Sequence, residues 1–182
     1  LLTYRSMSTS SFSAHHLTRI LTGIYLAVLV WIILLKFGVD FSYGGKQMIN
    51  WIPFPEVFVS GGRLDWSQVI LNMLIFLPFG IYLQVLFPQK TLSTNLFYCF
   101  LLSFSLELSQ YLLRVGAFDT TDLITNTAGG LMGLGIVKTM QSWTNHSPKV
   151  QKTINVLATL GTLLILTLLV LLKLDMLPIR YR

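Results

Sequence analysis

Glu107 is the residue whose position most strongly indicates chemistry. It lies inside the apolar stretch 95–113, which otherwise has the composition of a transmembrane helix. A carboxylate at that depth is unfavourable in lipid and commonly faces a cavity, a partner or a substrate path. Gln110 and Arg114 follow three and seven residues later, so the three side chains share one helical stripe. This spacing predicts a polar site near one end of the helix.

Three roles are open for Glu107. It could form a structural ion pair with Arg114 or Arg63, bind a ligand group, or act as a general acid or base. The two arginines could hold a phosphate or carboxylate in a bidentate fork. They could equally pair with nearby acidic side chains.

Composition identifies the environment of this site. Of 182 residues, 53% are hydrophobic and only 11% are charged, and the mean hydropathy is +0.68. A soluble domain carries about 25% charged residues. The chain is therefore expected to be an integral membrane protein, folded as a single domain over residues 1–182. The net charge of +6 fits basic membrane flanks, and no basic patch interleaved with aromatics indicates nucleic acid.

The fold is predicted to be all-α, with five transmembrane helices in one compact bundle. Five apolar segments each approach the roughly 20 residues that cross a bilayer. They are 17–37, 69–87, 95–113, 122–140 and 154–174. The fourth is the most polar and is expected to insert by packing between neighbours. The long connection 38–68 carries Trp51, Pro53, Pro55 and Trp66, which is typical of a segment in the headgroup region.

The orientation of the bundle follows from its acidic residues. Five crossings place the termini on opposite sides, and the Lys and Arg count does not decide between the two orientations. All seven acidic residues fall on or toward one side. We therefore expect a cytoplasmic N-terminus and an external C-terminus.

Alternating crossings also bring polar residues of separate helices to one end of the bundle. The start of the second helix, the end of the third and the start of the fourth must share the outer side. We expect this layer to form a ligand-binding pocket, with charges at the rim and amides deeper. Its members are Arg63, Asn72, Glu107, Gln110, Arg114, Asp119, Asp122 and Asn126.

The fourth helix carries two kinds of signal. Asp119, Asp122 and Asn126 are spaced three and four apart, on one stripe that Gly129 and the following glycines continue. Asp119 and Asp122 could instead cap the start of the helix. Asn72 could likewise be a structural bond between helices rather than a ligand contact.

Glycines on this helix predict close packing. Gly129, Gly130 and Gly133 include the Gly-x-x-x-Gly spacing typical of membrane helix contacts, either inside the chain or in a dimer. Pro78 predicts a kink in the second helix.

No metal or cofactor is indicated. The single cysteine, Cys99, lies in an apolar span and has no clustered partners. His15 and His16 are adjacent and have no third ligand nearby in the sequence. No nucleotide-binding glycine loop or Ser-His-Asp order is present.

Four stretches of the chain resemble the VanZ-like family of small bacterial membrane proteins. The third and fourth stretches include the patterns Ser-x-x-x-Glu-x-x-Gln and Asp-x-x-Asp-x-x-x-Asn-x-x-Gly, which together are fairly specific. The resemblance covers about 31–138, and the segment 154–174 matches only in being apolar. The four stretches are 50–54, 72–80, 105–110 and 118–130.

The resemblance implies a multi-pass protein of the bacterial plasma membrane, related to resistance against glycopeptide antibiotics such as teicoplanin. We expect its outward-facing polar pocket to bind an envelope component, either a lipid-linked cell-wall intermediate or a lipoglycopeptide. The alternative is a membrane enzyme acting on a lipid-linked or peptidoglycan substrate, with Glu107 or Asp122 as acid or base. We favour binding over catalysis. A third possibility is a structural partner that docks another membrane protein on the glycine face. The ligand and the oligomeric state stay open.

Overall fold

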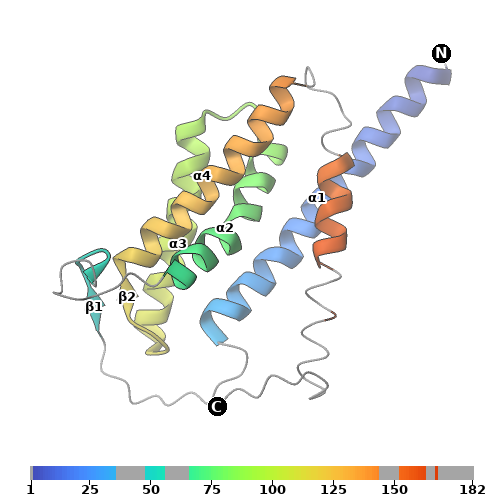
Figure 1. The fold of residues 1–182 in the computed structure, drawn as a ribbon. Helices are drawn as coiled ribbons and strands as arrows, with labels where there is room; N and C mark the ends of the chain where they lie inside the picture. Colours follow the sequence, from blue (N-terminus) through green and yellow to red (C-terminus); the bar gives the residue numbers. More distant parts are fainter. Residues whose placement is uncertain (1, 36–47, 56–65, 144–151, 163–166, 168–182) are drawn as a thin grey trace.

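The computed structural model describes residues 2–35, 48–55, 66–143, 152–162 and 167, with 2–14 and 35 described by their backbone alone. The described part is mostly helical (Figure 1). Its elements are α1 (Leu2–Leu35), β1 (Ile49–Asn50), α2 (Trp66–Leu86), α3 (Leu92–Leu113), β2 (Phe118–Asp119) and α4 (Thr120–Trp143). Residues 152–162 form a further helical segment.

Three of the described helices are long and apolar enough to cross a membrane. They are His15–Leu34 within α1, the whole of α2 and the whole of α3. α4 has sufficient length, but its Thr, Asn and Gly residues lower its hydropathy. The structure thus supports three of the five predicted spans. The fifth predicted span, 154–174, falls largely outside the described residues.

Helix boundaries differ from the predictions mainly at the N-terminal ends. α1 begins at Leu2 rather than at Leu17, because no Gly or Pro interrupts the polar residues before the apolar span. α3 begins at Leu92 rather than Asn95. The side chain of Thr91 accepts the backbone N–H of Thr94 and so caps the helix one turn earlier.

Glycines bring α2 and α4 into close, parallel contact. A Cβ added at Gly129 would overlap the backbone carbonyl of Met73, and one at Gly133 would overlap that of Leu77. Gly80 of α2 approaches the backbone of Gly130 in the same way. These contacts lie inside the chain and involve Gly129, Gly130 and Gly133, the residues for which the sequence predicts helix packing.

α3 runs antiparallel to α4 and completes the core. Gly130 faces Cys99, which is fully buried together with Leu134 in a cluster that also contains Phe79 and Leu83. Gly135, by contrast, has nothing within 4 Å of an added Cβ. The helix contacts therefore use Gly129, Gly130 and Gly133 but not Gly135.

α1 packs on the pair α2 and α3. The Tyr25 hydroxyl donates to the carbonyl of Ile75 at 2.7 Å, three residues before Pro78. Pro78 lies inside α2, which stays helical on both sides of it. Because proline lacks an N–H, it removes one backbone bond in this turn, and the tyrosine contributes a bond to the same region.

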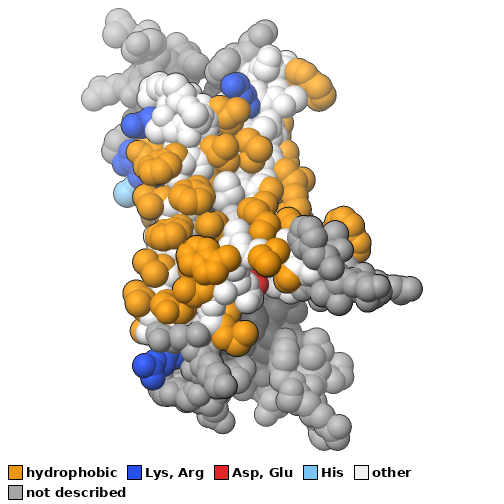
Figure 2. Space-filling model, turned by 90° about the vertical axis from the view of Figure 1, so that its left-hand side faces the viewer, with side chains coloured by type: hydrophobic (Ala, Val, Ile, Leu, Met, Phe, Trp, Pro, Cys, Tyr) orange, Lys and Arg blue, Asp and Glu red, His pale blue; other side chains and the backbone are white. Residues whose placement is uncertain are grey.

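The surface of the bundle is largely apolar. Hydrophobic side chains cover most of one face, and Lys and Arg side chains lie toward its two ends (Figure 2). Several α3 side chains, including Phe97 at 57% exposure and Leu101 at 44%, are open to the surroundings. This distribution is typical of a protein whose solvent is lipid.

One feature departs from an all-α fold. β1 and β2 form a parallel pair in which Ile49 lies opposite Phe118 and Asn50 opposite Asp119. Strands of two residues are too short to show the alternation by which a strand is recognised in a sequence. The pair joins the segment before α2 to the start of α4.

Candidate functional site

Polar side chains from three separate parts of the chain converge on the start of α4. Asn50 from β1, Asn72 from α2 and Glu107 from α3 all hydrogen-bond to this segment. We call the resulting cluster the polar junction. It consists of Asn50, Asn72, Glu107, Asp119, Thr121 and Asp122.

Glu107 is the most deeply placed acid of the junction. It is only 2% exposed, and its Oε2 accepts the backbone N–H of Asp119 at 2.9 Å. Backbone N–H groups at a helix start lack intrahelical partners and favour a negative charge nearby. Among the described residues, no ion pair joins Glu107 to Arg114, so that predicted pairing is not found. The carboxyls of Asp119 and Asp122 lie close enough to Glu107 to act on it electrostatically.

Asp119 fastens the loop, the strand pair and the helix together. Its Oδ1 accepts the backbone N–H of Thr121 at 2.7 Å, which is the bond of a helix N-cap. Its Oδ2 accepts the side-chain amide of Asn50 at 2.9 Å. The hydroxyl of Thr120 donates to the Asn50 carbonyl, and the Thr121 hydroxyl accepts the N–H of Phe54. The capping alternative for Asp119 is therefore realised in the structure.

Asp122 faces α2. Its Oδ1 accepts the amide of Asn72 at 2.7 Å and that of Gln68 at 3.1 Å. Gln68 and Asn72 are four residues apart and so present their amides from one face of α2. Two amide donors on one oxygen hold this half-buried carboxylate against α2.

A second polar layer lies deeper in the bundle. Asn126 is 3% exposed, and its amide donates to the hydroxyl of Ser103 at 3.1 Å. Its Oδ1 is buried and has no hydrogen-bond partner. Asn126 follows Asp122 by four residues, which places it about 6 Å further along the helix axis.

Two further predicted site residues, Gln110 and Arg114, lie outside the junction. Gln110 turns toward α1, where its amide donates to the carbonyl of Ile33 at 3.1 Å. Arg114 is exposed and ends α3 in the left-handed conformation with φ of 58°, its backbone N–H bonded to Gln110 and Tyr111. Arg63 lies outside the described residues. The residues of the stripe predicted on α3 thus contact different elements: Glu107 bonds to Asp119 at the start of α4, and Gln110 bonds to α1.

Comparison with known proteins agrees with the motifs. A family model described as VanZ/LLP1 matches residues 22–141, which run from α1 to α4 and include the whole junction.

The chain belongs to the VanZ/LLP1 family.

It is similar to Protein VanZ of Enterococcus faecium, with 32% identity over 158 residues that cover 85% of this chain and 91% of that protein. No solved structure matches the chain. The resemblance drawn from the sequence motifs is confirmed. Each of the four motif stretches of this VanZ/LLP1 protein contributes at least one side chain to the polar junction.

Several residues of the junction, and two hydrogen-bond partners of Asp122 and Asn126, were not singled out as site residues from the sequence. Asn50 and Thr121 lie within the recognised motifs, but their partners depend on the strand pair. Gln68 and Ser103 each precede a predicted site residue by four positions, namely Asn72 and Glu107. That helical spacing is the signal that could have found them.

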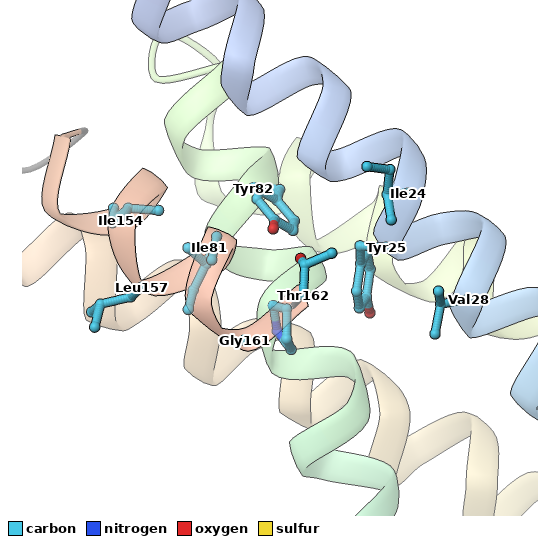
Figure 3. A pocket seen from close by; sticks show the side chains of 11 residues that line it. Ile24, Tyr25, Val28, Ile81, Tyr82, Ile154, Leu157, Gly161 and Thr162 are labelled. Carbon is cyan, nitrogen blue, oxygen red and sulfur yellow. The ribbon is translucent and has the colours of Figure 1, made fainter. Parts of the chain in front are cut away.

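A distinct cavity lies away from the junction. Its volume is about 260 Å³, and it is lined by α1, α2 and the helical segment 152–162 (Figure 3). Tyr25 and Tyr82 face it with ring centroids 5.7 Å apart, and its other lining side chains are almost all apolar. None of the predicted polar site residues that the structure describes is among its lining residues.

The described residues hold no group of three or more His, Cys, Asp or Glu side chains arranged to bind a metal ion. The junction carboxylates accept hydrogen bonds from amides and backbone N–H groups instead.

Proposed function

We propose that this VanZ/LLP1 protein is a bacterial envelope protein of the glycopeptide-resistance type, teicoplanin being the reference antibiotic. It binds the polar part of an envelope component, such as a lipid-linked cell-wall intermediate or a lipoglycopeptide, at the polar junction. The observation that carries this proposal is that each motif stretch contributes a side chain to one cluster of carboxylates and amides.

The accessible edge of the junction has suitable chemistry for such a ligand. Asn72 and Asp122 are half-buried and Gln68 is exposed, so their amide and carboxylate groups can reach hydroxyls and amines. Two exposed indole rings lie close by in the sequence: Trp51, at 71% exposure, follows Asn50, and Trp66, at 65%, begins α2 two residues before Gln68. Indole rings favour the membrane interface and stack on flat or sugar surfaces.

Hydrogen bonding favours binding over acid–base catalysis. A general base must have its carboxylate within reach of the substrate proton. Glu107 instead accepts a backbone N–H from within the bundle, and Asp122 accepts two amides. These bonds hold both groups in place, as a preformed recognition surface requires, and they support the enzyme alternative less well.

The proposed topology has five crossings with the N-terminus in the cytoplasm and the junction outside. Hydrogen bonds at both ends of α4 support this arrangement, because they join α2 and α4 as parallel helices. The Gln84 amide donates to the Gln141 side chain at one end, and the Asn72 amide donates to Asp122 at the other. Of the five exposed Lys and Arg side chains that the structure describes, four lie at the Gln84 end, and Arg114 lies with the junction acids at the opposite end. Cytoplasmic flanks are enriched in Lys and Arg. The four are Arg19, Lys90, Lys138 and Lys152.

The decisive experiment measures resistance. The chain is expressed in a glycopeptide-susceptible Gram-positive host, and the minimal inhibitory concentration of teicoplanin is compared with that of an empty vector. We expect the wild type to raise it and Asp122→Asn to abolish most of the rise, because the charged acceptor is lost. Leu131→Ala, at a 40% exposed position of α4, is the matched control and should retain the rise.

Two outcomes would contradict the proposal. If the wild type inserts in the membrane but does not raise the minimal inhibitory concentration, the resistance function is contradicted. If Asp122→Asn raises it as much as the wild type does, the polar junction is not the site of that function. Incubating purified protein with lipid-linked wall precursors separates the mechanisms. Retention without a new mass supports binding, whereas a product lost in Glu107→Gln would support an enzyme.

A further inference from the structure

A groove of about 480 Å³ runs between α2 and α3. One wall is formed by Phe79 and Leu83 of α2 and by Phe87 directly after it, which are spaced four apart and so form one stripe. On α3 the wall includes Leu101 and Ser105. Both helices are long and apolar enough to span the membrane, so the groove opens at bilayer depth and hydrocarbon is the solvent that can enter it.

The two ends of this groove differ in polarity. Lys90, in the short connection between α2 and α3, is the one charged residue among those that line it. The backbone N–H of Lys90 donates to the Phe87 carbonyl at 3.1 Å, which holds the turn at the mouth of the groove. At the far end the Ser105 hydroxyl already donates to the Leu101 carbonyl at 2.7 Å. The groove thus has a cationic mouth and an apolar floor.

Helix geometry gives the groove a length suited to a chain. Phe79 and Phe87 are eight residues apart, which corresponds to about 12 Å along the axis of α2. Tyr98 also lines the groove and is 37% exposed. A tyrosine near a membrane interface places its ring in hydrocarbon and its hydroxyl toward the headgroups.

We propose that the α2–α3 groove binds one acyl chain of an anionic phospholipid, whose phosphate rests on Lys90. A zwitterionic lipid could fill the same apolar wall but would lack the net charge that Lys90 attracts. The cavity of Figure 3 has no charged side chain in its lining and so has no comparable means of selecting a headgroup. The charged mouth at Lys90 lies at the opposite end of α3 from Glu107, although the groove extends along α3 as far as Ser105. The headgroup contact at Lys90 is therefore tested independently of the proposed resistance function.

Native mass spectrometry of the full chain tests the headgroup contact. The purified protein is exposed to equal amounts of phosphatidylglycerol and phosphatidylcholine with identical chains, and the retained lipids are counted. We expect the wild type to prefer phosphatidylglycerol. Lys90→Gln should lower this preference about fivefold, the factor given by about 1 kcal/mol per basic residue at an anionic surface. Lys138→Gln is the control, because Lys138 is exposed on α4 and does not line the groove.

A second pair of variants tests the chain contact. Leu101→Trp adds bulk inside the groove and should reduce retention of both lipids. Leu108→Trp, on an exposed part of the same helix outside the groove, should not. Variants are compared only when they elute as monodisperse protein with unchanged helix content. A wild type without headgroup preference, equal effects of the two lysine variants, or full retention in Leu101→Trp would each overturn the proposal.

Discussion

At the scale of single residues, the main finding concerns what a buried carboxylate does in this membrane protein. Glu107 neither pairs with Arg114 nor stands free; it accepts the backbone N–H of Asp119. Asp119 in turn caps α4 and holds Asn50. Acidic side chains for which the sequence left a catalytic role open thus position the start of α4.

Replacing Glu107 tests this positioning role. Glu107→Gln keeps a carbonyl oxygen that can accept the Asp119 N–H, whereas Glu107→Leu leaves that donor buried and unpaired. An unpaired buried donor costs about 1–3 kcal/mol. We expect thermal unfolding in detergent to show a clear loss for Leu and a smaller one for Gln. Equal losses for the two variants would contradict an acceptor role for Glu107.

The bond between Asn72 and Asp122 can be measured by a double-mutant cycle. The two side chains are 2.7 Å apart in the structure. Bonds between membrane helices contribute about 0.6 kcal/mol on average and at most about 1.7. We expect a coupling energy in that range between Asn72→Ala and Asp122→Ala in unfolding titrations. The matched cycle of Asn72→Ala with Lys138→Ala should give no coupling, since Lys138 lies near the far end of α4.

At the scale of elements, α4 is the helix on which the others assemble. It is not apolar enough to stand out as a span, yet its glycines contact α2 on one side and α3 on another. Close backbone approach increases van der Waals contact, which in lipid takes the place of a hydrophobic driving force. The polarity of α4 is compatible with insertion because its neighbours cover much of it.

Two glycines of α4 give a matched test of this packing. Gly133→Ala would place a methyl group against the carbonyl of Leu77, whereas Gly135→Ala meets nothing within 4 Å. Overpacking costs about 1–3 kcal/mol, and alanine in place of glycine in a helix gains roughly 0.5–1 kcal/mol. Thermal unfolding should therefore show destabilisation for Gly133→Ala only. Similar stability of the two variants would argue against the α2–α4 contact.

At the scale of the whole molecule, most of the described Lys and Arg side chains lie at the opposite end of the bundle from the junction acids, with Arg114 as the exception. The junction acids lie at the start of α4, and Lys138 lies near its end. The 24 residues of α4 correspond to about 36 Å of helix. That length exceeds the hydrocarbon thickness of a bilayer, which is about 30 Å. The two ends can therefore contact opposite leaflets.

Cysteine labelling in whole cells tests the proposed orientation. Trp51→Cys lies beside the junction at a 71% exposed position, and Trp143→Cys ends α4 at an 84% exposed one. The native Cys99 is fully buried and should stay unlabelled. An impermeant maleimide should label position 51 from outside and position 143 only after permeabilisation. The reverse pattern would reject the orientation, and labelling of both from outside would reject a crossing by α4.

The sequence by itself determined the helical character, the membrane setting, the glycine face of α4 and the family. Each of these follows from composition, from helical period or from motifs that are local in the chain. It also placed Asn72, Glu107, Asp119 and Asp122 at one end of the bundle, because alternating spans leave few choices of depth. Their partners were decided only by the tertiary structure. Helical spacing states on which face a side chain lies, but not how two helices are rotated against each other.

That rotation sends Gln110 to α1 while Glu107 reaches α4. It also leaves the Asn126 carbonyl buried without a partner. The strand pair that brings Asn50 to Asp119 is two residues long, too short to leave a periodic pattern. Hydrogen bonds are short-ranged and directional, so the choice among several nearby donors depends on ångström-scale positions that only the packed helices define.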